Sequence, residues 1–172
     1  RRSRLAPALA ALMGGVALFV SNLNWLDPQI TPLVPVLKSY WLMIHVSVVT
    51  ASYGFFGICA ACGIASLAAT AFGRNLRELR AINEMAMIVG LALLTAGIFF
   101  GAVWANESWG RYWGWDPKET WALITMFAYA LATHSRHIPR LDGPFAFDVL
   151  SVVCFSTVLM TFFGVNYYLS GL

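Results

Sequence analysis

The chain has 172 residues, of which 59% are hydrophobic and 11% are charged, with a mean hydropathy of +0.70. An ordinary soluble domain is about half apolar and about a quarter charged. The composition therefore excludes a typical soluble domain and favours a membrane protein whose solvent is the bilayer. The net charge of +3 is small, and no nucleic-acid-binding signature accompanies it. The first residue is Arg1 rather than Met, which is typical of a fragment or a processed product.

Five apolar stretches are long enough to cross a membrane as helices, which takes roughly 17 to 25 residues. In chain order they lie at about 5–21, 41–72, 83–104, 118–136 and 146–170. Helices are expected because a helix satisfies its own backbone polar groups inside hydrocarbon. We therefore predict an all-α bundle of about five transmembrane helices, which forms one membrane domain over residues 1–172.

The arginines predict the orientation of this bundle. With five spans, three clusters fall on one face: Arg1, Arg2 and Arg4; Arg74, Arg77 and Arg80; Arg136 and Arg140. The positive-inside rule makes this face cytoplasmic, so the N terminus lies inside and the C terminus outside. The loops at about 22–40 and 105–117 are then external.

A tryptophan-rich segment lies at residues 104–121 and contains the run WGRYWGWDPKETW. An aromatic belt at the membrane interface explains single rings at helix ends, such as Trp25. It explains less well why Trp109, Trp113 and Trp115 crowd one short loop, with glycines that permit tight turns between them. This crowding favours a surface for a ligand or a partner.

The residues after this loop predict the start of the fourth helix. Asp116 has the character of an N-cap, and Pro117 suits the first helical position. Glu119 falls in the first turn, where a negative charge favours the helix dipole.

The ligand that suits this segment is flat, largely apolar and anionic at one edge. Indole rings such as that of Trp121 stack on flat rings. Arg111 and Lys118 can pair with carboxylates at the rim. Haem fits this description, and a quinone fits it less well.

Two histidines are candidates for binding a haem iron, and a third, His137, is expected to be a solvated loop residue. His45 lies one turn into the second helix, at a depth similar to that of the tryptophan segment. His134 follows Lys118 by 16 residues, which is about 24 Å of helix. His45 and His134 therefore cannot serve the same haem position. An ionisable group inside a span is a functional candidate, although a histidine bonded to a neighbouring helix carbonyl is the alternative.

Cys59 and Cys62 have the spacing of a redox or metal-binding pair. They lie in the middle of an apolar helix, where a thiolate is poorly solvated, so we expect them to be packing residues. Cys154 also lies in an apolar run, and the three cysteines predict no disulfide framework. Asn166 in the last span is expected to bond to a neighbouring helix.

The run WGRYWGWDPKETWALIT resembles the tryptophan-rich WWD signature of the haem-handling proteins. The form WDPKETWALIT is most similar to the CcsA type, also called ResC, of System II cytochrome c biogenesis. The segments SYWLMIHV at 39–46 and FFGVNYYLSGL at 162–172 match the same type. The resemblance covers roughly 36–172, and members of the type have further spans, which implies that this chain is a core fragment.

The resemblance implies that the chain binds haem b as a transported substrate on the WWD segment. It implies presentation of that haem to the CxxCH motifs of apocytochrome c, beside a CcsB/ResB-type partner subunit in a holocytochrome c synthase. His45 matches one external haem ligand, and the second is expected just beyond Leu172. His134 matches an internal histidine that would serve an earlier haem station.

The location implied by the resemblance is the bacterial cytoplasmic membrane, or alternatively the thylakoid membrane. The WWD segment then faces the periplasm or the lumen, with lipid around the helices. A haem exporter or chaperone without ligation activity is the alternative function. A quinone-binding or electron-transfer subunit is less favoured, because the histidines are not paired at matching depth.

Overall fold

The computed structural model describes residues 5–21, 39–73 and 77–169. All five predicted helical segments are present: α1 (Leu5–Ser21), α2 (Tyr40–Ala71), α3 (Arg77–Trp109), α4 (Pro117–Thr133) and α5 (Pro144–Leu159). After α5 the helix continues through a π-helical segment, Met160–Gly164, into α6 (Val165–Tyr168). A short 3-10 turn, Ser135–His137, follows α4. The described residues contain helices and no strand, which confirms the all-α prediction.

Within the described residues, three helices are both long and apolar enough to cross a membrane: α2, α3 and the continuous helix Pro144–Tyr168. The other two predicted spans, α1 and α4, have 17 residues each. That length is at the lower limit of about 17 for a membrane span. The count of five spans is therefore approximate. Most of the predicted external loop at 22–40, with Trp25, lies outside the described residues, as do Arg1, Arg2, Arg4 and Arg74.

The third helix is longer than its apolar stretch, and this corrects one prediction. The apolar stretch covers 83–104, but the helix runs from Arg77 to Trp109, so Trp104 and Trp109 are helical and the loop is only 110–116. Hydropathy locates only the apolar part of a helix, whereas the helical backbone hydrogen bonds continue into polar residues until a terminating residue is reached. Gly110 ends it here with a φ of +72°, and its amide donates to the Asn106 carbonyl at 2.8 Å. This is a left-handed C-terminal cap, for which glycine is favoured.

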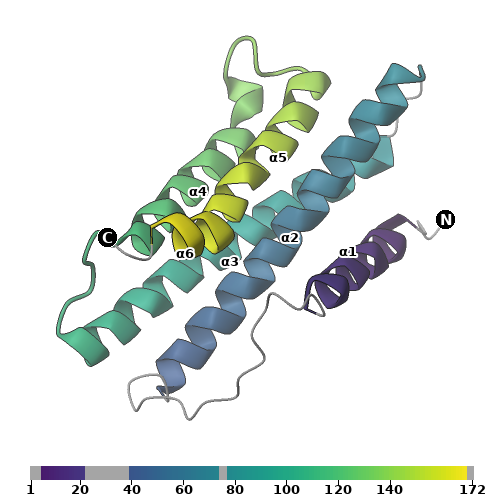
Figure 1. Cartoon of the computed structure of the whole chain (residues 1–172). Coiled ribbons are helices and arrows are strands. Elements are labelled where there is room, and N and C mark those ends of the chain that lie inside the picture. The colour runs from purple at the N-terminus through teal and green to yellow at the C-terminus, as the bar shows by residue number, and fades with distance from the viewer. Residues whose placement is uncertain (1–4, 22–38, 74–76, 170–172) are drawn as a thin grey trace.

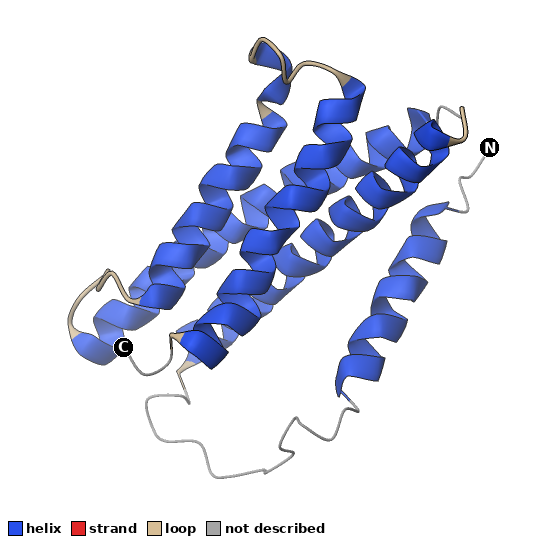
Figure 2. Cartoon of the chain, turned by 45° about the horizontal axis from the view of Figure 1, so that its top comes forward, coloured by secondary structure: helices blue, strands red, loops and turns tan. Residues whose placement is uncertain are grey.

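The helices α2 to α5 form a bundle in which each packs against the next and α5 returns to pack on α2 (Figure 1). The helix α1 lies beside α2 on the outside of this bundle (Figure 2). In the core, the rings of Phe56 and Tyr129 stack with centroids 3.6 Å apart. A Cβ at Gly90 would lie 2.8 Å from the Phe56 ring, so this glycine makes room for the stack.

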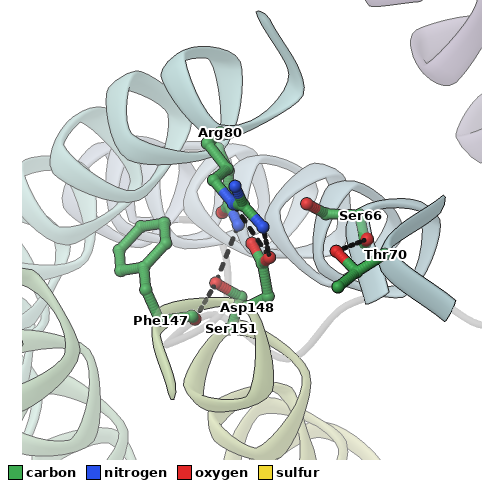
Figure 3. Close-up of polar contacts among 7 residues, drawn as sticks. Ser66, Thr70, Arg80, Phe147, Asp148 and Ser151 are labelled. Carbon is green, nitrogen blue, oxygen red and sulfur yellow. Dashed lines mark hydrogen bonds and ion pairs between the residues drawn. The ribbon is translucent and has the colours of Figure 1, made fainter. Parts of the chain in front are cut away.

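A buried polar cluster joins α3 to α5 near one end of the bundle (Figure 3). The guanidinium of Arg80 pairs with the fully buried carboxylate of Asp148 at 2.9 Å. One turn along α3, the amide of Asn83 donates to the Ser151 hydroxyl at 2.8 Å. On the facing helix, a Cβ at Gly63 would lie 2.8 Å from the Asp148 carbonyl, so α2 approaches α5 closely here.

The cysteines are packing residues, as expected. Cys59, Cys62 and Cys154 are all free and buried. The thiol of Cys59 donates to the Asn83 carbonyl, and that of Cys154 donates to the Ala128 carbonyl, each at 3.5 Å.

Candidate functional site

A cavity of about 590 Å³ opens among α2, α3, α4, the 110–116 loop and the π-helical segment. Small-molecule sites usually measure about 300–1,000 Å³, so this cavity can hold a sizeable organic ligand. Much of its wall is apolar helix residues, and its chemistry comes from a smaller set of polar and aromatic side chains. These are His45, Thr50, Tyr53, Trp104, Trp109, Tyr112, Trp113, Asp116, Lys118, Glu119, Thr161, Phe162 and Asn166.

The imidazole of His45 is fixed by α3. Its Nδ1 lies 2.7 Å from the carbonyl oxygen of Gly97. A carbonyl oxygen can only accept, so Nδ1 carries the proton and donates. In the neutral ring the lone pair is then on Nε2, and a neutral imidazole with a bare nitrogen is the form that binds a metal. The expected alternative for His45, a bond to a neighbouring helix carbonyl, is thus present and leaves one ring nitrogen available for ligation.

The tryptophans of the segment divide into two groups. Trp104 and Trp109 lie on the last turns of α3 with ring centroids 4.7 Å apart, and both line the cavity. Trp113 lines it from the loop. Trp115 packs edge-on against Trp113 but is 70% exposed and does not line the cavity. Trp121, on α4, is half-buried and is also absent from the lining.

The loop that carries Trp113 is held by the first turn of α4. The Asp116 carboxylate accepts from the amide of Glu119 at 2.8 Å. The Glu119 carboxylate accepts from the amides of Gly114 at 2.7 Å and Asp116 at 3.3 Å. This is a capping box followed by Pro117 at the first helical position, which confirms the predicted helix start. Asp116 and Glu119 therefore both orient the loop.

The two cations of the segment take different places. Lys118 lines the cavity. Arg111 lies over the Trp109 ring, with 6.0 Å from its Cζ to the ring centroid, and its guanidinium packs against Gly114. Arg111 is exposed and does not line the cavity. The structure thus brings Lys118 to the cavity and sets Arg111 outside it.

His134 lies at the other end of α4, where it is the C-terminal cap. It is exposed, and its Nδ1 donates to the Ala130 carbonyl at 2.8 Å. Its ring centroid is 6.4 Å from that of His137. Nearby, Arg136 pairs with Glu84 of α3 at 2.6 Å. His45 and His134 therefore occupy opposite ends of the bundle, as their positions in the sequence predicted.

Five polar contributors to the cavity among the described residues were not predicted: Thr50, Tyr53, Tyr112, Thr161 and Asn166. Tyr53 follows His45 by eight residues, and helical spacing alone places both on one face of α2. Thr161 lies in the π-helical segment, a rare geometry that often occurs at functional sites. Asn166 donates to the Phe162 carbonyl of its own helix at 2.7 Å, so the expectation of a bond to a neighbouring helix was wrong.

Comparisons with known proteins point to one family. The family model described as cytochrome C assembly protein matches residues 2–172. Protein NrfI of Wolinella succinogenes is 49% identical over 180 residues, which cover 100% of this chain and 20% of that protein. The cytochrome c biogenesis protein CcsA of Chlamydomonas reinhardtii is 38% identical over 152 residues, covering 84% of this chain and 43% of the relative.

The CcsA protein of Guillardia theta is 36% identical over 196 residues, covering 95% of this chain and 65% of the relative. The chain thus spans between a fifth and about two thirds of the length of these relatives. The family match extends over nearly every residue, including both sides of the cavity. The chain therefore belongs to the cytochrome c assembly family and is a CcsA-type member of it.

Proposed function

We propose that this chain acts in cytochrome c biogenesis by binding haem in the cavity and presenting it for attachment to apocytochrome c. Haem b is then a transported substrate, and the CxxCH thiols of apocytochrome c are the acceptors. In this proposal the chain is one part of a holocytochrome c synthase and works beside a CcsB/ResB-type partner subunit. Family membership supports the pathway, and the geometry of the cavity supports haem as the ligand.

The observation that carries the proposal is the meeting of His45, three tryptophans and Lys118 around one cavity. Imidazole is a common axial ligand of haem iron, and His45 keeps Nε2 for that role. The indole faces of Trp104, Trp109 and Trp113 suit a porphyrin plane, and the Lys118 ammonium suits a propionate.

A further polar group supports a ligand with an acceptor at its edge. The Nε1 of Trp113 is buried and has no hydrogen-bond partner among the described residues. A buried donor without an acceptor is costly, by about 1–3 kcal/mol. A carboxylate that reached this nitrogen would satisfy it. The chain's contribution is then binding and orientation, while thioether formation is chemistry of the haem vinyls and the substrate thiols.

The charges at the two ends of the bundle support an outward-facing cavity. Arg77 begins α3, and Arg136 and Arg140 follow α4, so all three lie at the end opposite the 110–116 loop. By the positive-inside rule that end is cytoplasmic. The cavity then faces the periplasm of a bacterial cytoplasmic membrane, or the lumen if the membrane is a thylakoid. His134, at the inner end, is proposed as an earlier haem station.

Haem binding is tested by purifying the chain from haem-replete cells and measuring the Soret absorbance per protein. We expect bound haem in the unmodified chain and a weakened Soret band in His45→Ala, because the cavity then lacks its axial ligand while His134 is retained. His137→Ala is the matched control for the cavity, because His137 is exposed and does not line it; since the ring centroids of His137 and His134 lie 6.4 Å apart, a loss of haem in this variant would report on the inner station instead. Equal haem content in the His45 and His137 variants would remove His45 from the site.

Ligation is tested separately, by co-expression with the partner subunit and a CxxCH reporter in cells that lack any other synthase. Covalent haem on the reporter supports a synthase. Haem that is held by the chain but never attached to the reporter supports the alternative, a haem chaperone or exporter.

A further inference from the structure

Two glycines lie one turn apart on α3 where it packs against α2: Gly97, whose carbonyl meets His45, and Gly101, which lines the cavity. Small residues at this spacing usually allow two helices to pack closely. Gly97 has that role, because a Cβ there would lie 2.5 Å from a methyl carbon of Val49. Gly101 differs, since a Cβ there would lie 2.7 Å from Cε1 and 2.8 Å from Nδ1 of His45. The space at Gly101 is thus filled by the imidazole and not by a packing side chain.

We infer that Gly101 is a positioning residue for His45. It admits the imidazole against α3 so that Nδ1 meets the Gly97 carbonyl and Nε2 is the nitrogen presented to a ligand. This inference rests on the proposed haem site and deepens it. The two glycines act on different properties of the ring. The Gly97 carbonyl selects the tautomer, and the missing Cβ of Gly101 sets where the ring lies.

The hydrogen bond has a chemical consequence for a bound metal. A histidine ligand that donates its other ring N–H to a carbonyl is held in one orientation and becomes more basic toward the metal. Removal of such an outer contact typically weakens metal binding by about 10- to 100-fold. A Cβ at Gly101 would push the ring from the Gly97 carbonyl, because Cε1 and Nδ1 are the atoms it meets first, with Nε2 next at 3.4 Å.

The test compares three glycine-to-alanine variants of the full chain in detergent. Gly101→Ala targets the imidazole, Gly97→Ala targets Val49 and retains the carbonyl, and Gly54→Ala meets nothing within 4 Å. Alanine is the better helix former at each position, so a weakened helix cannot explain a loss. The measurements are haem affinity by titration, the electron paramagnetic resonance spectrum of the ferric form, and the reduction potential.

For Gly101→Ala we expect haem affinity to fall about 10- to 100-fold. Its ferric spectrum should change, and its potential should rise because the ligand is less basic. Gly54→Ala should match the unmodified chain in affinity and spectrum, and Gly97→Ala should lower thermal stability because its Cβ meets Val49. Unmodified affinity and spectrum in Gly101→Ala would overturn the inference.

A second measurement needs no variant at the glycines and no haem. In the haem-free chain, 15N spectra of labelled histidine, assigned with His45→Ala, report which ring nitrogen bears the proton. We expect the proton on Nδ1 of His45, and a proton on Nε2 with a bare Nδ1 would overturn the inference. If the unmodified chain never binds haem, the proposed function fails. The tautomer of His45 would still test the inference, because it reports the orientation of the ring without any haem.

Discussion

The carboxylate of Glu119 accepts a hydrogen bond from the backbone amide of Gly114 at 2.7 Å, which ties the tryptophan loop to the first turn of α4. The same carboxylate accepts from the amide of Asp116. One side chain therefore fixes the backbone on both sides of Trp115. With the loop held in this way, Trp113 lines the cavity and Trp115 points into the surroundings.

Replacing Glu119 should loosen this loop. In Glu119→Ala, the amides of Gly114 and Asp116 lose their acceptor, and the expected cost is about 0.5–2 kcal/mol, as for loss of a helix cap. Glu119→Gln keeps an amide oxygen that can accept, so it should retain much of the stability. Thermal unfolding in detergent measures both, and Lys118→Ala serves as the control because its side chain takes no part in the capping box. Equal unfolding temperatures for the three variants would contradict this role of Glu119.

The tryptophans should differ in their effect on haem binding according to the cavity. Trp113→Ala removes a lining ring, and an aromatic contact adds about 0.5–1.5 kcal/mol beyond its buried area, so affinity should fall roughly tenfold. Trp115→Ala removes a ring that is 70% exposed and outside the lining, so affinity should change by less than about twofold. Haem titration measures both, and a larger loss in the Trp115 variant would mean that the loop closes differently around its ligand.

The buried ion pair of Arg80 and Asp148 should dominate stability at the end of the bundle far from the cavity. Asp148→Ala leaves a largely buried guanidinium without this partner, which costs about 3–5 kcal/mol. Removal of both charges should cost less than the sum of the single losses, because the two sites are coupled. The exposed pair of Glu84 and Arg136 is the control, because breaking a surface ion pair should lower the free energy of unfolding by only about 0–1 kcal/mol. The free energy of unfolding is measured for both single variants and for the double variant. If the loss in the double variant equalled the sum of the two single losses, the ion pair would not contribute to stability.

Tyr129 tests the cost of a buried hydroxyl. Its ring stacks on Phe56, whereas its hydroxyl is buried with no hydrogen-bond partner among the described residues. Tyr129→Phe keeps the stack and removes the unsatisfied group, so the unfolding temperature should stay equal or rise. Phe56→Ala removes the stack and should cost about 3–5 kcal/mol. A clear loss of stability in Tyr129→Phe would show that the buried hydroxyl has a hydrogen-bond partner and would contradict this prediction.

The helices and the two ends of the bundle could be predicted from the amino-acid sequence. Long apolar stretches permit little besides helices in lipid, and this predicts all five segments within a few residues at most ends. The start of α4 at Pro117 follows from local chemistry, because a capping box uses side chains only three residues apart. The separation of His45 from His134 follows from the rise of a helix, which is fixed at about 1.5 Å per residue.

Which side chains share the cavity depends instead on the packing of the helices. The extension of α3 to Trp109 places that ring and Trp104 in the wall, whereas the path of the loop sets Trp115 and Arg111 outside it. Thr161 and Asn166 line the cavity from the π-helical segment and the helix that follows it, and a π-helix has no periodic signature in the sequence. The pairing of His45 with Gly97 joins residues 52 positions apart, and such contacts depend on how two helices pack. Neighbouring residues specify the hydrogen bonds within a helix, while the site is made of contacts between helices.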